Sequence, residues 1–492
     1  MKRYDRALVW FRRDLRADDH AALSHALAEA RAVYCAFVFD TEILDPLTRK
    51  ADRRVEFIWR SLLELRKDLN LLGGDLHVLY GRARDRILAF AHSHEIQAVY
   101  INHDYEPLAI SRDRDVARRL GAEQRALHTF KDQVIFEKSE ILNAEQRPYV
   151  VFTPYKKAWL AKLGECDTKP YPVASRAEAL ASGESGPIPA LESIGFSRTN
   201  LSELNITAGT AGARSLFETF MRRIGAYAER RNFPAEAGPS LLSVHLRFGT
   251  ISIRELVRSV IAVEADADAS DGASAWLSEL IWREFYFSIL HHFPHVAQGA
   301  FKREYEALAF DNRESHFRNW CNAATGYPLV DAAMRQLNAT GYMHNRLRML
   351  TASFLVKDLH VDWRWGERYF AQNLNDYDLA ANNGGWQWCA STGCDAQPYF
   401  RIFNPVTQSR KFDPRGAFIR LYLPELSGVP DKYVHEPWKM PPEVQRTSGC
   451  VIGQTYPEPI VDHAAARKKA LTLYSAVRSA TKSADQRTGN NN

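Results

Sequence analysis

The sequence predicts a parallel α/β domain with Rossmann-like alternation, followed by a nearly all-α domain, with a long linker between the two. The chain has 492 residues, which is more than one hydrophobic core usually serves, so two domains are expected. Short apolar runs alternate with helical periodicity only in the first part of the chain, and helical periodicity dominates the rest.

The α/β domain is expected over residues 1–130. Runs rich in β-branched and aromatic residues predict strands at 7–11, 32–39, 76–80, 98–102 and 125–130. Helical periodicity lies between these runs, at 21–31, 52–72, 84–95 and 109–120. Neither a G-x-G-x-x-G loop nor a Walker A loop follows any of the strands. The usual dinucleotide and triphosphate loops are therefore missing.

The interdomain linker is expected over residues 131–208, where scattered Pro, Gly and Ser accompany weak periodicity. The helical domain follows over 209–475. Its clearest segment is 331–358, which is interrupted at Thr340-Gly341. The polar end, 476–492, is expected to be a flexible tail.

Composition is that of a soluble globular chain, with 46% hydrophobic and 25% charged residues. The net charge of +5 permits an anionic partner, but the pI of 8.7 is below the value of about 9 that marks a dedicated nucleic-acid domain. The 6 cysteines form no C-x-x-C pair, and no His cluster has metal spacing, so neither a metal site nor a disulfide framework is expected. No apolar run approaches about 18 residues and no signal-like segment opens the chain, so we expect a cytoplasmic protein outside the membrane.

Three polar and aromatic clusters stand out in the helical domain. Residues 376–388 combine acids, amides, a Gly-Gly step and two tryptophans, which together suit a planar polar ligand. Glu279, Trp282 and Arg283 share one helical face, and 341–349 carries a further polar group of side chains. A half-buried helix with a surface ion pair explains one such cluster better than a ligand does. Three clusters in one domain favour a shared pocket.

Six ordered motifs carry a resemblance to a known family. They are WFRRDLR (10–16), WLSELIWREFY (276–286), TGYPLVDAAMRQL (325–337), MHNRLRM (343–349), DLAANNGGWQW (378–388) and FRIFNP (400–405). Together they resemble the DNA photolyase and cryptochrome family, most closely the class I cyclobutane pyrimidine dimer photolyases. The resemblance runs from Val9 to about His463. It implies an N-terminal antenna domain and a C-terminal helical domain that holds one FAD per chain.

The resemblance also implies which residues contact FAD. They are Tyr227, Ser240, Leu242, Ser243, Glu279, Arg283, Asn345, Arg348, Asp376, Asp378 and Asn382. Pro239 stands where the family often has threonine, which removes one hydroxyl contact. Asn382 matches the residue that faces the flavin nitrogen carrying the redox proton. A neutral amide is not a ready proton donor, which suits a reduced anionic flavin.

The same resemblance implies light-dependent repair of cyclobutane pyrimidine dimers by electron transfer from excited reduced FAD to a flipped dimer. The electron then returns to the flavin. Trp282 and Trp388 match the indoles that sandwich the dimer, and Glu279 and Asn345 match the groups that hydrogen-bond it. Met349 stands where relatives that repair (6-4) lesions carry a histidine, and its thioether has no proton to give. With Asn382 these residues form the expected catalytic set.

Two arginines and several aromatic residues have further expected roles. Arg346 and Arg401 resemble phosphate contacts, although solvated surface arginines explain each one alone. Trp386 and Trp363 match two members of the tryptophan chain that reduces the flavin, whereas the outer position falls near Phe310. Trp320, Trp365 or Tyr369 could substitute for that outer member in principle, and core packing also explains each of them.

The antenna and the function class leave alternatives open. Glu106 resembles a carboxylate that holds methenyltetrahydrofolate in some relatives, but a deazaflavin, an FMN or no antenna chromophore also fits. The expected partner is DNA with UV-induced pyrimidine dimers, bound by a monomer. The alternatives are a cryptochrome-type blue-light photoreceptor that binds FAD without repair, and a DNA-binding flavoprotein without catalysis.

Overall fold

The computed structural model describes residues 2–183, 185–204, 206–264 and 268–489. They form two compact units, each assembled from separate stretches of sequence. The first unit contains residues 1–148, 156–225 and 240–291, and the second unit contains 149–155, 226–239 and 292–492.

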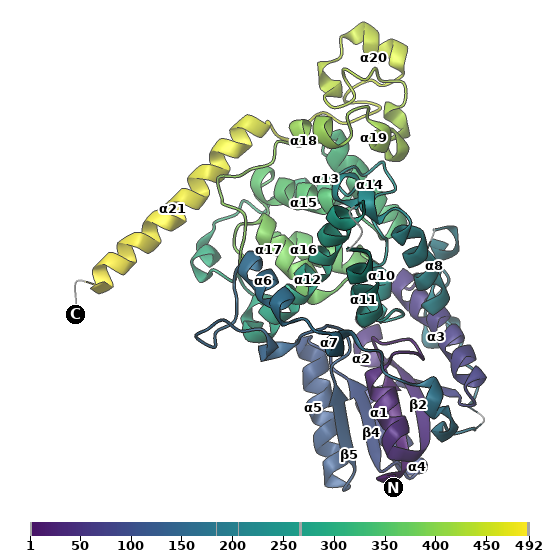
Figure 1. Cartoon of the computed structure of the whole chain (residues 1–492). Helices are drawn as coiled ribbons and strands as arrows, with labels where there is room; N and C mark the ends of the chain where they lie inside the picture. Colours follow the sequence, from purple (N-terminus) through teal and green to yellow (C-terminus); the bar gives the residue numbers. More distant parts are fainter. Residues whose placement is uncertain (1, 184, 205, 265–267, 490–492) are drawn as a thin grey trace. The chain divides into compact units, whose positions relative to one another are not determined.

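The first unit contains a five-stranded parallel sheet with the order β3-β2-β1-β4-β5 (Figure 1). The strands are β1 (Tyr4–Phe11), β2 (Ala30–Asp40), β3 (Leu76–Gly81), β4 (Ala98–Asn102) and β5 (Ala126–Phe130). Each strand coincides with one predicted apolar run, give or take a few residues. The expected α/β class of the N-terminal part is therefore confirmed.

Helices cover both faces of this sheet, because side chains alternate along each strand. Val9 and Phe11 of β1 pack with α1 (Ala21–Glu29) and α3 (Arg53–Leu71) in one hydrophobic cluster. Leu8 and Trp10 face the other way and pack with helices in a second cluster. Those helices are α4 (Ala83–Ser93) and α5 (Pro107–Ala122).

The connector expected over 131–208 contains two short α-helices, α6 (Phe152–Lys162) and α7 (Glu165–Thr168). The buried carboxylate of Glu284 holds it to α12 (Ser270–His292). This carboxylate accepts hydrogen bonds from the backbone N–H groups of Ile135 and Phe136 at 2.8 and 2.9 Å. It also accepts one from the indole of Trp159 at 2.5 Å. The helix that carries Glu279, Trp282 and Arg283 is thereby tied to the connector.

The expected border at residue 209 does not coincide with a border between the units. Helix α8 (Gly209–Met221) begins there and packs on α3 of the first unit. The Gly209 N–H donates to Ser61 Oγ at 3.2 Å, and the Ala211 N–H donates to Glu64 Oε1 at 2.7 Å. The first unit also contains α10 (Ser243–Phe248), α11 (Ile253–Glu264) and most of α12.

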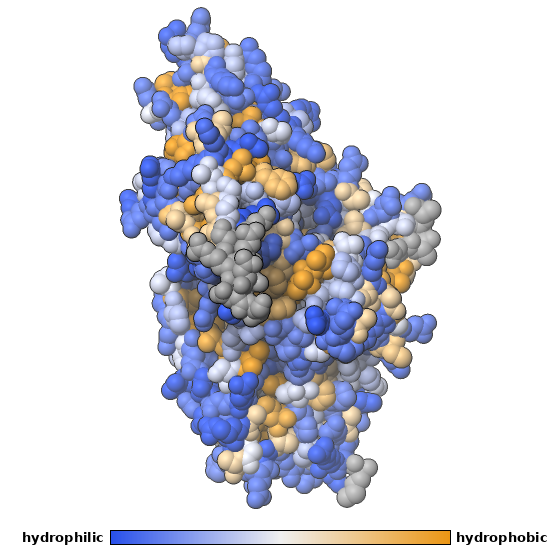
Figure 2. Space-filling view, turned by 90° about the vertical axis from the view of Figure 1, so that its left-hand side faces the viewer, coloured by the Kyte–Doolittle hydropathy of each residue, from blue (hydrophilic) through white to orange (hydrophobic). Residues whose placement is uncertain are grey.

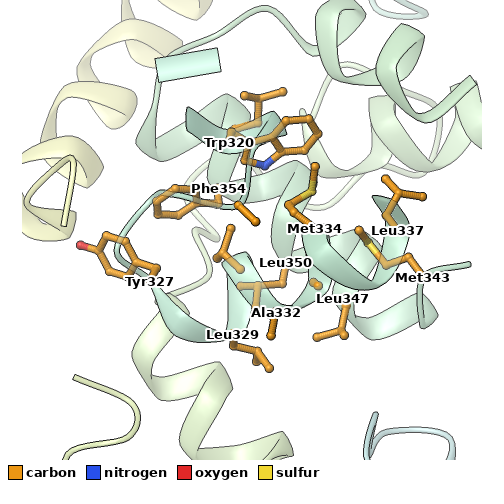
Figure 3. Packing of buried hydrophobic residues seen from close by; sticks show 14 of the residues in the cluster. Trp320, Tyr327, Leu329, Ala332, Met334, Leu337, Met343, Leu347, Leu350 and Phe354 are labelled. Atoms are coloured by element: carbon orange, nitrogen blue, oxygen red, sulfur yellow. The ribbon is translucent and has the colours of Figure 1, made fainter. Parts of the chain in front are cut away.

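Helices are the only regular secondary structure that the described residues of the second unit form, which confirms the all-α class expected for the C-terminal part. Its helices are α9 (Tyr227–Arg230), α13 (Glu314–Cys321), α14 (Pro328–Thr340), α15 (Asn345–Ser353), α16 (Trp363–Asn373), α17 (Leu379–Cys389), α18 (Pro405–Phe412), α19 (Ala417–Tyr422), α20 (Pro442–Ser448) and α21 (His463–Gly489). Side chains of α13, α14 and α15 form the core seen in Figure 3.

The predicted interruption after Thr340 is present. Gly341 ends α14 with a φ of +69°, a left-handed conformation that favours glycine. Its N–H donates to the Leu337 carbonyl at 2.8 Å. At the other end of the unit, α21 continues to Gly489, so most of the segment expected to be a flexible tail is helical in the structure.

The surface visible in Figure 2 is mainly hydrophilic, with apolar residues in small separate patches. Among the described residues, no helix is both long enough and apolar enough to cross a bilayer.

We expect Glu284→Ala to destabilise the protein by about 3 kcal/mol, because buried N–H groups lose their common acceptor. Urea unfolding followed by circular dichroism measures this change. Glu284→Gln is the matched control, since its amide oxygen still accepts hydrogen bonds, and it should cost clearly less. Equal losses for both variants would contradict the anchoring role.

Candidate functional site

Helix α17 carries most of the 376–388 cluster, and its start is fixed by Asp378. The Asp378 carboxylate accepts hydrogen bonds from the N–H groups of Ala380 and Ala381 at 3.0 and 3.4 Å, as an N-cap residue does. Asp378 is buried. One carboxylate oxygen of Asp378 thus caps the helix. These hydrogen bonds fix both the side chain of Asp378 and the start of α17.

Asp376 and Arg348, both implied FAD contacts, form an ion pair. Arg348 Nη2 lies 2.8 Å from Asp376 Oδ2 and 3.1 Å from Oδ1. The guanidinium also donates from Nε to the Met343 carbonyl at 2.8 Å. The Asp376 side chain is 7% exposed and that of Arg348 is 26% exposed. The two side chains therefore hold each other in place, and the Arg348 side chain remains partly accessible.

Asn382, one turn into α17, is held by Glu367 of α16. Its amide Nδ2 donates to Glu367 Oε1 at 2.8 Å and to the Glu367 carbonyl at 3.1 Å. Burial raises the pKa of the Glu367 carboxyl. With its N–H group turned toward Glu367, the Asn382 amide presents its oxygen to a ligand. No sequence signal pointed to Glu367, because its role depends on the packing of α16 against α17.

Trp386 lies between α16 and α17 and is 2% exposed. A Cβ at Gly366 would come within 2.1 Å of its ring, so only glycine allows this approach. The ring also packs edge-on against Phe370, with centroids 5.0 Å apart. Its Nε1 is buried and has no hydrogen-bond partner among the described residues. Trp388 on the same helix is half-buried.

The polar cluster at 341–349 maps to the start of α15. Asn345 is exposed at the first residue of that helix, and Met349 is half-buried one turn later. Arg346 is stacked on the Phe412 ring, 4.6 Å from its centroid, and donates to Asn232. Arg401, by contrast, is exposed. Of the two arginines expected to contact DNA, Arg401 is the more accessible.

Trp363, the second expected relay residue, begins α16 and is 3% exposed. Tyr227, an expected FAD contact, is also largely buried at 9% exposure and starts α9. The Arg231 guanidinium lies 5.5 Å from the centroid of the Tyr227 ring. Both residues belong to the second unit.

The first unit carries the remaining expected contacts. On α12, Arg283 donates to the Gln133 carbonyl at 2.6 Å, and the ring of Trp282 lies 5.6 Å from that of Tyr286. Glu279 is half-buried one turn earlier. Three further expected contacts, Ser240, Leu242 and Ser243, lie at the start of α10. The expected site residues thus fall into two sets, one on each unit.

Glu106, the expected antenna contact, already has two cationic partners within the first unit. Its Oε1 lies 2.6 Å from Arg247 Nη1 and 3.2 Å from Arg13 Nη1. Arg13 also pairs with Asp104 at 3.1 Å. A ligand on Glu106 would have to share or displace these arginines. Arg247 was not anticipated, because nothing in its local sequence distinguishes it.

The comparisons with known proteins agree with this architecture. Residues 7–175 match the family model described as DNA photolyase, and residues 276–476 match the one described as the FAD binding domain of DNA photolyase. The deoxyribodipyrimidine photo-lyase of Vibrio cholerae is 40% identical over 485 residues, covering 96% of this chain and 99% of that protein.

Solved structures give the same result. The class III photolyase of Agrobacterium tumefaciens has a TM-score of 0.89 and 33% identity, covering 97% of this chain and 99% of that one. A Synechocystis cryptochrome has a TM-score of 0.86 and 27% identity, covering 96% of this chain and 100% of that one.

A parallel α/β domain followed by a helical FAD-binding domain defines a flavoprotein of the photolyase and cryptochrome class. The chain belongs to the DNA photolyase family. The expected resemblance and the expected FAD-binding domain are thereby confirmed. The closer likeness to class I stays a prediction, since the Agrobacterium structure is of class III.

The residues of the second unit suit a flavin ring. Arg348 offers a donor, Asp376 an acceptor and Asn382 an amide oxygen, and these are the groups that a heteroaromatic ring with both N–H and carbonyl groups requires.

We expect Gly366→Ala to destabilise the FAD-free protein by about 1–3 kcal/mol, because the added methyl overlaps the Trp386 ring. Thermal and urea unfolding measure the loss. Gly385→Ala is the matched control. A Cβ there meets no atom of the described residues within 4 Å, and alanine favours helix by about 1 kcal/mol over glycine. A Gly366→Ala protein as stable as its parent would contradict the packing described.

Proposed function

We propose that this protein repairs cyclobutane pyrimidine dimers in DNA under blue light, as a photolyase with one bound FAD. The main support is the Arg348–Asp376 pair together with the Glu367-bound Asn382 of the second unit, in a chain whose residues 276–476 match a photolyase FAD-binding domain. When bound, reduced FAD would supply, on excitation, the electron that opens the cyclobutane ring, and it would take that electron back afterwards.

The chain's own residues bind and orient the flavin. Arg348 and Asp376 hold each other in one geometry, so little side-chain freedom is lost when they bind a ring. Asn382 keeps its N–H group on Glu367 and offers its oxygen to a flavin N–H. Because an amide does not readily release a proton, this contact favours a flavin that stays reduced.

The lesion would be recognised by stacking and hydrogen bonds. Trp388 is half-buried, so part of its indole can receive a flipped base, and Trp282 is the proposed partner face. Glu279 and Asn345 are the proposed hydrogen-bonding groups. Met349 has no acidic proton, which favours the cyclobutane dimer over lesions whose repair needs an acid.

A cryptochrome-type receptor that binds FAD without repair is the second candidate. Its support is the structural likeness to the Synechocystis cryptochrome. A photolyase and a receptor of this family share the fold and the flavin, so only a measurement of repair distinguishes the two functions.

For either function we propose a cytoplasmic monomer. An antenna chromophore of the folate, deazaflavin or FMN class is an optional second cofactor near Glu106.

The decisive experiment illuminates the purified, reduced protein with blue light on an oligothymidylate that contains cyclobutane dimers. We expect the thymine absorbance to recover only in the light. Recovery should disappear in Glu279→Ala and Trp282→Ala, because the dimer loses a hydrogen-bond acceptor or a stacking face.

Glu255→Ala is the matched control, since it removes a half-buried carboxylate of the same unit that pairs with Arg214 at 3.2 Å. This variant should repair like the parent chain. Bound FAD without any recovery would reject the photolyase and support the receptor.

Arg401→Ala should weaken binding to dimer-containing DNA and lower the salt dependence of that binding. Each phosphate contact contributes a slope of about −0.9 in a plot of log K against log salt, so we expect the slope to fall by about one. Fluorescence anisotropy at several salt concentrations gives this slope. Arg318→Ala, which removes a guanidinium of the same unit whose side chain is 72% exposed, should leave it unchanged. Equal slopes for the parent and Arg401→Ala would rule out the phosphate contact.

A further inference from the structure

A continuous line of redox-active side chains leads away from Trp386 inside the second unit. The ring centroids of Trp386 and Trp320 lie 6.1 Å apart at an interplanar angle of 71°. Those of Trp320 and Tyr369 lie 5.6 Å apart at 65°. Trp320 is 0% exposed and belongs to the cluster drawn in Figure 3, whereas Tyr369 is partly exposed.

We propose that Trp386, Trp320 and Tyr369 form an electron relay that reduces the flavin, a proposal that rests on the flavin of the proposed function. The outer position of the expected relay holds Phe310, whose ring has no readily oxidised group. Phe310 packs against both the main core and the small cluster around Tyr474. The route through Trp320 avoids this phenylalanine.

Hydrogen bonding gives the relay a direction. Trp386 Nε1 is buried and has no acceptor among the described residues, so an oxidised Trp386 can neither release its proton nor gain stabilisation there. Trp320 Nε1 donates to the Thr351 carbonyl at 3.1 Å. A carbonyl oxygen on the N–H group stabilises a positive charge on the indole, especially inside a protein. A positive charge is therefore more stable on Trp320 than on Trp386.

Tyr369 is suited to be the end of the relay. Its hydroxyl donates to Asn338 Oδ1 at 2.7 Å and to the Cys321 carbonyl at 3.1 Å. Neither of these two carbonyl oxygens is a base, and in the proposed relay the phenolic proton goes to water when the ring is oxidised. The partial exposure of Tyr369 on α16 allows this transfer.

Three one-electron transfers make up the proposed relay. Trp386 gives one electron to the photoexcited oxidised flavin, which is thereby reduced by one electron, and Trp386 becomes a radical cation. Trp320 gives one electron to Trp386, and Tyr369 gives one electron to Trp320 and one proton to water. Both tryptophans return to their starting state, and an external thiol reduces the tyrosyl radical that remains.

A flash experiment on the FAD-loaded protein tests this route. Blue flashes without added thiol should produce a tyrosyl radical, detected by transient absorption and by electron paramagnetic resonance. Ring-deuterated tyrosine should change the resonance spectrum. Tyr369→Phe, which removes only a hydroxyl, should abolish the tyrosyl signal, and Trp320→Phe should abolish it as well.

Trp365→Phe is the matched control, since it removes an indole of α16 that lies outside the proposed relay, and it should keep the tyrosyl signal. Trp363→Phe tests the competing route through the second expected relay residue, and it should also keep the signal if Trp320 carries the electron. A signal that persists in Tyr369→Phe or in Trp320→Phe, or that is lost in Trp363→Phe or Trp365→Phe, would overturn the proposal. Flavin absorbance and the thermal midpoint show whether each variant is folded. If Trp320→Phe is not folded, Trp320→Leu replaces it, and Tyr369→Phe decides independently.

Repair of dimers by chemically reduced protein separates this proposal from the proposed function, because reduction in advance makes the relay unnecessary. Trp320→Phe that repairs normally when reduced but forms no tyrosyl radical supports the relay. A parent protein that forms the tyrosyl radical but repairs nothing would reject the photolyase and keep the relay.

Discussion

The close packing of α16 against α17 is the constraint on which the site of the second unit depends. Because Gly366 has no side chain, the Trp386 ring lies directly over the backbone of α16, which fixes the rotation of α17. Asn382, one turn before Trp386, then meets Glu367 of the same neighbouring helix. The Asp378 cap fixes where α17 begins. Rotation and start together determine where each polar side chain of α17 points.

Charge pairing is a second constraint, and it acts in both units. Burying an isolated charge costs several kcal/mol, so a charged group near a buried site needs a fixed partner. Arg348 has Asp376 in the second unit, and Glu106 has Arg13 and Arg247 in the first. Paired groups still present directed donors and acceptors. A ring system can therefore be recognised by the geometry of its hydrogen bonds, and the site needs little net charge to attract it.

The sequence predicted those features that depend on local pattern. The five strands follow from short apolar runs, and the break after α14 follows from Gly341. The unit borders were not predictable, because α8 belongs with α3, and periodicity does not say which distant helix a helix packs on. Glu367 and Arg247 were missed for the same reason. Their roles depend on partners that are far away in the sequence.

Trp320 shows why sequence alone does not separate a relay residue from a core residue. Its indole fills space beside other large side chains, and a fully buried tryptophan needs no further explanation than packing. The difference between Trp320 and Trp386 is in the environment of one N–H group, which has a carbonyl acceptor in the first case and none in the second. Packing brings the two rings together, and hydrogen bonding sets the order in which they are oxidised. The same core can therefore provide stability and a directed path for an electron.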